Sequence, residues 1–144
     1  MIKIFLASDH GGFELKQKIQ EHLSKQAYEL VDLGCPNGDK CDYPEFGQKA
    51  AEAVVAEEGS FAIIICGSGI GISIAANRVK GARCVLANTV ELAELGRQHN
   101  GANMLAMGAR TKGYDDPIEI LEAFLKAELD PADRHARRRA QLDA

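Results

Sequence analysis

A cysteine followed by three alternating glycines is the feature of this sequence best suited to chemistry. In the segment IIICGSGIGISIAANR an apolar run ends at Cys66, and Gly67, Gly69 and Gly71 lead into a helical pattern. Glycines let successive N–H groups point into one space at a helix start, where the helix dipole also attracts anions. Such a turn would favour the thiolate of Cys66 and an oxyanion beside it, so the thiol could act as a base or a nucleophile. The alternative is a tight turn with a buried, inert cysteine.

The spacing of these glycines argues against three familiar anion-binding motifs. GxGxG is not the GxGxxG dinucleotide fingerprint, and no acidic residue follows about 20 positions later. A P-loop would need GxxxxGK[ST], which the chain lacks. A cysteine phosphatase would need an arginine soon after the nucleophile, where this chain has Ile72, Ser73 and Ile74. NAD binding, nucleotide hydrolysis and thiol phosphatase chemistry are therefore disfavoured.

Asp9 and His10 form a second candidate group in the segment SDHGG. An Asp-His pair at a strand end can bind a sugar hydroxyl or relay a proton, and the two glycines would let a ligand approach the backbone. The alternative is that Asp9 caps the following helix and that His10 is incidental. Near the C-terminus, Arg134 and Arg138 are four positions apart and would share one helix face, where they could grip a phosphate. A solvated basic tail is equally compatible with that spacing.

Five apolar runs, each followed by an amphipathic segment, must position these residues. Near-continuous apolar strands that alternate with helices predict an α/β, Rossmann-like, doubly wound fold with a five-stranded parallel sheet. We expect one domain over residues 1–144, with an arginine-rich helical tail over 130–144. The expected strands are 2–8, 28–34, 61–66, 82–88 and 102–109, and the expected helices are 13–26, 44–58, the glycine turn to about 78, 89–100 and 116–129.

In an open parallel sheet, ligands bind beyond the carboxyl ends of the strands. This rule selects Ser8 to His10, the 35–43 loop, Cys66 to Gly71, Asn88 and the 108–110 segment. His99, in the segment RQHN, falls instead at the amino end of the sheet, a strand length of roughly 17–20 Å away. If His99 and Cys66 both act in one reaction, a second subunit in a C₂ dimer must supply His99. The alternative is a histidine placed at a helix C-terminus by the helix dipole.

Composition and charge limit the classes of binding partner and the cellular compartment that we expect. The chain has 144 residues, a net charge of −4 and four cysteines. No binding to nucleic acid or to a membrane is expected, and no secretory leader or spanning segment is recognisable. The cysteines lack the spacing of a zinc site, so we expect reduced thiols in a cytoplasmic protein without a bound metal.

Taken together and in order, the motifs SDHGGFELK, DYP, ICGSGIGISIAANR, RQHN, NMLAMGAR and RHARR resemble the type B ribose-5-phosphate isomerases and their relatives that act on six-carbon sugar phosphates. The resemblance covers essentially the whole chain. It implies an aldose–ketose isomerisation through an enediolate, without a metal or an organic cofactor. It also implies a homodimer with shared active sites, or a tetramer built from such dimers.

The resemblance also implies roles for individual residues. Cys66 would be the base, and His99 of the neighbouring subunit would be the acid that opens the furanose ring. Ser68 stands where the family more commonly has threonine, and it would hold the enediolate oxygen together with the N–H groups of the turn. The implied catalytic residues are Cys66, His99, Ser68, Asp9 and His10, and the implied substrate contacts are Asp9, His10, Tyr43, Gly67, Ser68, Gly69, Ile70, Gly71, Asn100, Arg110, Arg134 and Arg138.

Two alternatives remain at this point. One is an isomerase of the same fold acting on allose 6-phosphate or galactose 6-phosphate, because the sequence does not fix the depth of the pocket. The other is a non-catalytic phosphate-binding module of flavodoxin-like fold. A receiver domain would carry its phosphoacceptor aspartate at the end of the third strand, where this chain has Cys66.

Overall fold

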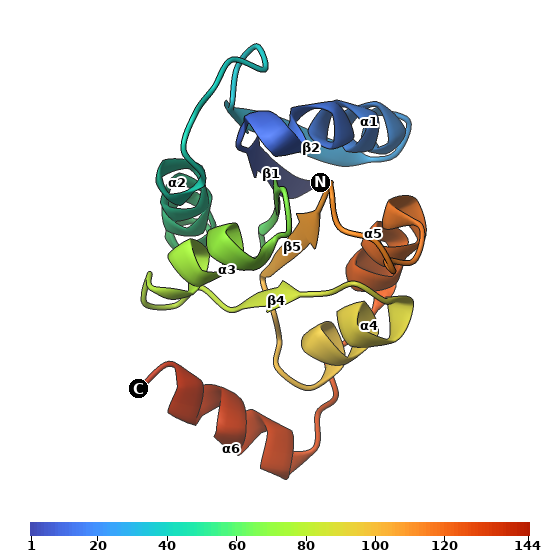
Figure 1. The fold of residues 1–144 in the computed structure, drawn as a ribbon. Coiled ribbons are helices and arrows are strands. Elements are labelled where there is room, and N and C mark those ends of the chain that lie inside the picture. Colours follow the sequence, from blue (N-terminus) through green and yellow to red (C-terminus); the bar gives the residue numbers. More distant parts are fainter.

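The computed structural model describes residues 1–144 and places one parallel sheet between two layers of helices (Figure 1). The predicted α/β fold with a five-stranded parallel sheet is confirmed. The strands are β1 (Ile2–Ser8), β2 (Tyr28–Gly34), β3 (Phe61–Cys66), β4 (Cys84–Leu86) and β5 (Met104–Gly108). The helices are α1 (Phe13–Ser24), α2 (Tyr43–Ala56), α3 (Ile70–Asn77), α4 (Val90–Gln98), α5 (Pro117–Lys126) and α6 (Asp133–Leu142), and a short 3₁₀ turn, η1 (His10–Gly12), precedes α1.

Successive residues of the central strands face different helical layers. Ile4 and Leu6 of β1 pack with α1, α4 and α5, whereas Phe5 and Ala7 pack with α2 and α3. The residues of β3 and β5 alternate in the same way. Because both faces of the sheet are covered, nearly every position in these strands is apolar, as the sequence pattern indicated.

The strand order β2-β1-β3-β5-β4 creates a reversal of direction between β1 and β3. These two strands are neighbours, but α1 follows β1 onto one face of the sheet and α3 follows β3 onto the other (Figure 1). Such a reversal opens a crevice at the carboxyl ends of the two strands. The segments that border it are Asp9 to Gly12 and Cys66 to Gly71.

The edge strand β4 covers only the middle of the predicted 82–88 segment, and side chains bind the backbone where it begins. The Asn77 amide accepts from the Cys84 N–H at 2.8 Å and donates to the Cys84 carbonyl at 3.0 Å. The side-chain oxygen of Asn103 likewise accepts from the Arg83 N–H at 2.8 Å. Arg83 therefore lies in the loop before β4, and Cys84 is the first residue of the strand.

Two further features complete the fold. Cys35 and Cys41 are paired in a disulfide, so the expectation of four reduced thiols is wrong for these two residues, while Cys66 and Cys84 are free. The pairing arises because the irregular loop after β2 folds back on itself, which residue spacing did not reveal. None of the helices combines the length and the apolar character needed to cross a membrane.

Candidate active site

Cys66 ends β3 and lies directly before the start of α3. Its side chain is 4% exposed, and its Sγ accepts a hydrogen bond from the Gly69 N–H at 3.2 Å. Gly69 has φ = +80°, and a Cβ there would come within 2.8 Å of the Met107 carbonyl carbon, so only glycine fits. The turn therefore points a backbone donor at the sulfur, as a thiolate or a neighbouring oxyanion requires.

Ser68 and Tyr43 complete this glycine turn. The Ser68 hydroxyl oxygen accepts from the Ile70 N–H at 3.1 Å, which leaves its own O–H free to donate. The Ser68 carbonyl accepts from the Tyr114 hydroxyl at 2.9 Å. A Cβ at Gly71 would lie 2.5 Å from the Tyr43 ring, so this aromatic side chain rests directly on the backbone of Gly71. The loop after β2 is thus brought to the turn after β3.

Asp9 and His10 lie across the crevice at the end of β1. The Oδ1 atom of Asp9 accepts from the Gly12 N–H at 3.0 Å, so Asp9 caps the 3₁₀ turn η1, whereas the N-cap of α1 itself is Gly12. The Nδ1 atom of His10 lies 3.1 Å from the Cys41 carbonyl oxygen and 3.3 Å from the Cys41 nitrogen. His10 is therefore fastened to the loop after β2, on the side of the crevice opposite the thiol.

Arg110 provides a cation at this edge of the sheet. Its backbone N–H donates to the Gly67 carbonyl at 2.8 Å, and a Cβ at Gly11 would be 3.3 Å from its guanidinium. A cavity of about 680 Å³ opens beside it, with His10 and Lys18 also in its lining. Arg110 and Lys18 give the lining two cations against the single carboxylate of Glu14, a balance that favours an anion such as a phosphate group.

Lys16 supports the loop after β2, and the sequence analysis missed it. Its side chain is fully buried, and its Nζ donates to Asp32 at 2.7 Å and to the Cys35 carbonyl at 3.0 Å. A usable signal existed, because Lys16 falls on the same helical stripe as the buried Ile19 and Leu23. A lysine within an apolar stripe indicates an internal partner.

His99 and Asn100 lie at the other end of the sheet. His99 is the C-cap of α4, and the chain then enters β5 at Met104. Cys66 pairs with Gly108, the last residue of β5, so the two side chains are separated along the strand by about 13 Å or more. The predicted location of His99 at the amino end is confirmed. Within one chain, the structure does not bring His99 to the thiol.

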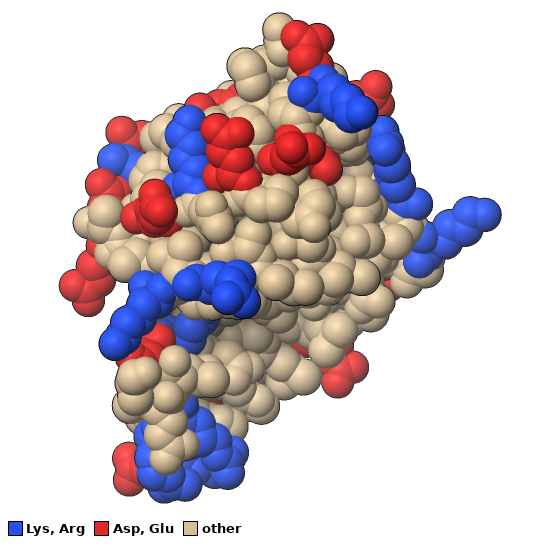
Figure 2. Space-filling view, turned by 60° about the vertical axis from the view of Figure 1, so that its left-hand side comes forward, with Lys and Arg blue, Asp and Glu red and all other residues tan.

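Helix α6 packs against His99 and carries the remaining sequence candidates. Arg134 and Arg138 are exposed on α6, and Figure 2 shows its basic side chains gathered at the lower end of the molecule. His135 is buried against His99, with ring centroids 4.1 Å apart and planes inclined by 9°. Arg139 donates from Nη1 to the His99 carbonyl at 3.0 Å. The contact of His135 was not predicted, because nothing in the local sequence relates two residues so far apart in the chain.

The stacked pair is poorly arranged to hold a metal ion. A nitrogen or oxygen atom from each of His99, Asp130 and His135 lies within 4.8 Å of the others. Metal ligands must direct their lone pairs at one point, however, and the in-plane lone pairs of two parallel imidazoles do not converge. The geometry is that of a stacked aromatic pair beside a carboxylate.

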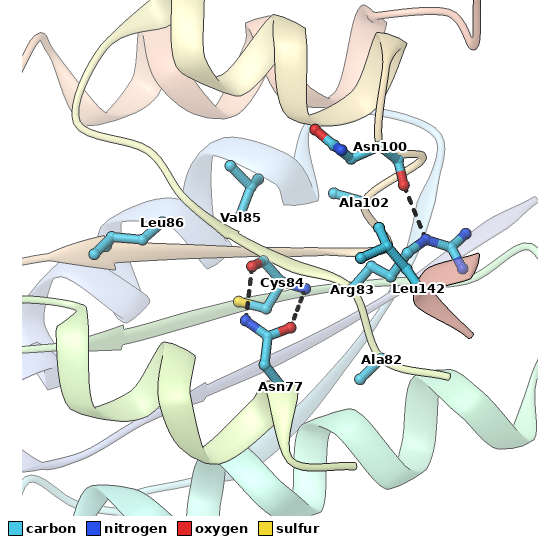
Figure 3. A pocket seen from close by; sticks show the side chains of 9 residues that line it. All are labelled: Asn77, Ala82, Arg83, Cys84, Val85, Leu86, Asn100, Ala102 and Leu142. Atoms are coloured by element: carbon cyan, nitrogen blue, oxygen red, sulfur yellow. Dashed lines mark hydrogen bonds between the residues drawn. The ribbon is translucent and has the colours of Figure 1, made fainter. Parts of the chain in front are cut away.

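A hollow of about 520 Å³ lies beside this region, between α3, β4 and α6 (Figure 3). Asn100 and Leu142 line it from one side and Val85 and Leu86 from the other. Arg83 holds its wall in place, because Nε donates to the Asn100 carbonyl at 2.9 Å. The guanidinium also pairs with Asp143, and so ties the end of the chain to the same loop.

The second free thiol, Cys84, differs from Cys66 in its surroundings. Burial raises the pKa of the Cys84 thiol well above its ordinary value. Its backbone is held on both sides by the Asn77 amide (Figure 3). Cys84 is therefore a structural thiol of the edge strand.

Comparison with known proteins places the chain among sugar isomerases. The Ribose/Galactose Isomerase family model matches residues 4–142. Ribose-5-phosphate isomerase B of Mycobacterium tuberculosis is 43% identical over 138 residues, which are 95% of this chain and 85% of that protein. The Escherichia coli protein of the same name is 41% identical over 96% of this chain and 92% of its own length.

Solved structures agree with the sequence comparison. A ribose-5-phosphate isomerase B from Clostridium thermocellum superposes with a TM-score of 0.93 at 44% identity, covering 99% of this chain and 95% of that one. A Mycoplasma genitalium ribose-5-phosphate isomerase B, solved with bound ribulose-5-phosphate, gives a TM-score of 0.92 at 39% identity, covering 99% of this chain and 94% of that one. With a family model and relatives of this identity spanning nearly its whole length, the chain belongs to the Ribose/Galactose Isomerase family.

Proposed function

We propose that this protein interconverts ribose 5-phosphate and ribulose 5-phosphate, as an aldose–ketose isomerase whose base is Cys66. The observation that carries the proposal is the N–H of Gly69, which is directed at the Cys66 sulfur at the start of α3. The relatives named above support the choice of a five-carbon substrate. Residues 1–144 would form one isomerase domain, with the 130–144 tail reaching the site of a second copy.

The proton transfer follows from the chemistry of the glycine turn. In the open-chain aldose, the Cys66 thiolate removes the proton from C2, and the electron pair moves through the C1–C2 bond to the carbonyl oxygen. The enediolate that forms carries negative charge, which the N–H groups from Gly67 to Gly71 and the Ser68 hydroxyl would stabilise. The O2 hydroxyl proton then moves to O1, which transfers the negative charge to O2. The thiol returns its proton to C1 as the C2 carbonyl forms, and this completes the ketose. Asp9, His10 and Tyr43 would hold the sugar in place during these steps.

The ring-opening step needs a proton donor beside the ring oxygen of the substrate. Ribose 5-phosphate is largely a furanose in water, and opening it requires a proton on the ring oxygen. We assign this proton to His99 of a second copy, with Asn100 beside it. Arg110 of the first copy, and Arg134 and Arg138 of the second, would bind the phosphate.

The surface next to the thiol supports a homodimer. Ile70 and Ile74 of α3 are 53% and 56% exposed, although both are large and apolar. The hollow lined by Leu86 and Leu142 continues this surface, and much of the face in Figure 2 carries no charge. Apolar side chains exposed beside a site are typical of a surface that another protein covers. A second copy on this face would bring its His99 towards the first copy's Cys66.

The decisive experiment compares wild-type protein with Cys66→Ala on ribose 5-phosphate in the presence of a metal chelator. Allose 6-phosphate and galactose 6-phosphate are assayed alongside. We expect the wild type to convert ribose 5-phosphate fastest and the variant to be inactive, although it still binds the sugar phosphate. Conversion of only a six-carbon sugar would move the assignment to that substrate. No conversion of any of the three would favour a phosphate-binding module and contradict the proposal.

A further inference from the structure

His135, whose imidazole stacks on that of His99, has no role in the proposed reaction. His135 is 8% exposed, and its Nε2 atom is buried without a hydrogen-bond partner. The nearest carboxylate oxygen, on Asp130, is 3.7 Å away. Leaving a buried polar nitrogen without a partner is unfavourable, so stability does not explain a histidine at this position.

Contacts around His135 fix its ring against one face of His99. His135 and Arg139 are one turn apart on the inner side of α6, and Arg139 donates to the His99 carbonyl at 3.0 Å. The Asp130 N–H donates to the Gln98 carbonyl at 2.8 Å. The segment before α6 and the middle of α6 are thus both fastened to the end of α4. The ring of His135 has little freedom to move away from His99.

Stacking holds an imidazole without occupying its nitrogens. A hydrogen bond from a neighbour would consume one of the two ring nitrogens of His99, whereas a parallel ring covers only one face. Both in-plane nitrogens remain available to a substrate. A proton donor that must act on a ligand carried by another chain needs this combination of fixed orientation and free nitrogens.

Burial and the charges around the pair disfavour protonation of His135. Burial and the nearby positive charges of His99, Arg134 and Arg138 lower the pKa of His135, and Asp130 opposes this only in part. Two protonated rings stacked at this distance would repel each other, so the stack favours a neutral His135 whenever His99 is protonated.

We propose that His135 is a positioning residue for ring opening, which holds the His99 imidazole by stacking so that a ring nitrogen faces the furanose oxygen of the substrate. This inference rests on the proposed function. His135 itself would touch no reacting atom. Its loss should therefore affect the cyclic substrate and spare the chemistry of the acyclic one.

Two measurements separate these steps. Ribulose 5-phosphate is acyclic, because the hydroxyl that would close a furanose carries its phosphate. Incorporation of solvent deuterium at its C1, followed by NMR in D₂O, reports on the enediolate alone. Conversion of ribose 5-phosphate reports on ring opening as well. The ratio of the conversion rate to the exchange rate isolates the contribution of the ring-opening proton donor.

His135→Leu keeps the apolar bulk that docks α6 but removes the flat ring, and His135→Phe restores a flat ring without the nitrogens. We expect His135→Leu to lower kcat for ribose 5-phosphate about tenfold and to leave deuterium exchange within about twofold of wild type. His135→Phe should recover conversion to within about threefold of wild type. Arg137→Ala, at an exposed position on the same helix, is the matched control and should change neither rate.

Three results would overturn the inference: no effect of His135→Leu on either rate, equal losses in both, or no recovery with His135→Phe. Equal losses with a raised KM would mean that His135 only docks α6 and its phosphate-binding arginines. His99→Asn, measured in parallel, separates this inference from the proposed function. If His99→Asn leaves ribose 5-phosphate conversion unchanged, the ring-opening assignment itself fails. If His99→Asn is selective and His135→Leu is not, only the inference fails.

Discussion

The two ends of the sheet are constructed differently. At the carboxyl end, main-chain bonds hold the turn, since the Ala109 and Arg110 N–H groups donate to the carbonyls of Cys66 and Gly67 at 2.9 and 2.8 Å. At the amino end, the long side chains of Arg83 and Arg139 reach across to loop carbonyls. An anion site must be preorganised to act, and a turn between buried strands provides that rigidity. A proton donor needs only to be held within reach of the substrate. The end of α4, with α6 packed against it, is sufficient for that.

The largest effect should come from removing the thiol at the carboxyl end. Cys66→Ala should lower kcat about a thousandfold, because the proposed reaction assigns removal of the C2 proton to this thiol. It should lower deuterium exchange into ribulose 5-phosphate to the same extent. Cys84→Ala, which removes the other free thiol, should retain activity close to wild type. Similar losses in both variants would mean that the two thiols do not differ as their surroundings indicate.

The next effect tests whether the two halves of one site come from different chains. Cys66→Ala and His99→Asn should each convert ribose 5-phosphate poorly, the latter by about a hundredfold. When equal amounts are dissociated together and allowed to reassemble, half of the dimers are mixed and contain one intact site. Activity should then rise to about a quarter of wild type. Mixing without reassembly is the control, and the absence of any rise would place both halves in one chain.

A smaller effect should follow from crowding the rigid turn. The Cβ of Gly71→Ala would meet the Tyr43 ring at 2.5 Å, so the ring must move off the turn. We expect KM for ribose 5-phosphate to rise about fivefold, or about 1 kcal/mol in binding free energy. Removing the ring as well should relieve the clash, so Gly71→Ala combined with Tyr43→Ala should be no worse than Tyr43→Ala alone. An additive loss in the double variant would show that the clash is not the cause.

The smallest effect is a pH dependence in the packing of α6 at the amino end of the sheet. The folded environment lowers the pKa of His135 below 6.5, and an undocked tail restores it. As the pH falls below about 6.5, the protein with α6 undocked therefore binds more protons than the protein with α6 docked. Docking of α6 weakens until the pH passes the lowered pKa of His135 in the docked state. Amide hydrogen exchange over residues 133–142, corrected for intrinsic rates, should quicken between pH 7.5 and about 5.5. His135→Leu should remove this pH dependence, and its persistence would assign it to another group.

Much of the fold and half of the candidate site were predictable, because they depend on local patterns. Apolar runs identified the strands, and the order of strands and helices placed Asp9 and Cys66 at one edge and His99 at the other. The remaining features depend on contacts between distant segments. The stacking of His135 on His99 and the pairing of Lys16 with Asp32 arise where side chains meet across the fold. The apolar stripe of α1 indicates that Lys16 is internal, but no spacing along the chain identifies the partner of either side chain.

Helix α6 contributes no side chain to either apolar cluster of the core. It is attached through His135, Arg139 and the ion pair between Arg83 and Asp143. Substitutions in this tail therefore cost the core little stability, because they empty no volume between the sheet and its helices. The tail can consequently change in sequence with little loss of fold stability, outside the positions to which we assign roles, Arg134, His135 and Arg138. Under the proposed function, adaptation to a longer or shorter sugar phosphate would therefore fall first on this tail, while the core that holds the glycine turn stays unchanged.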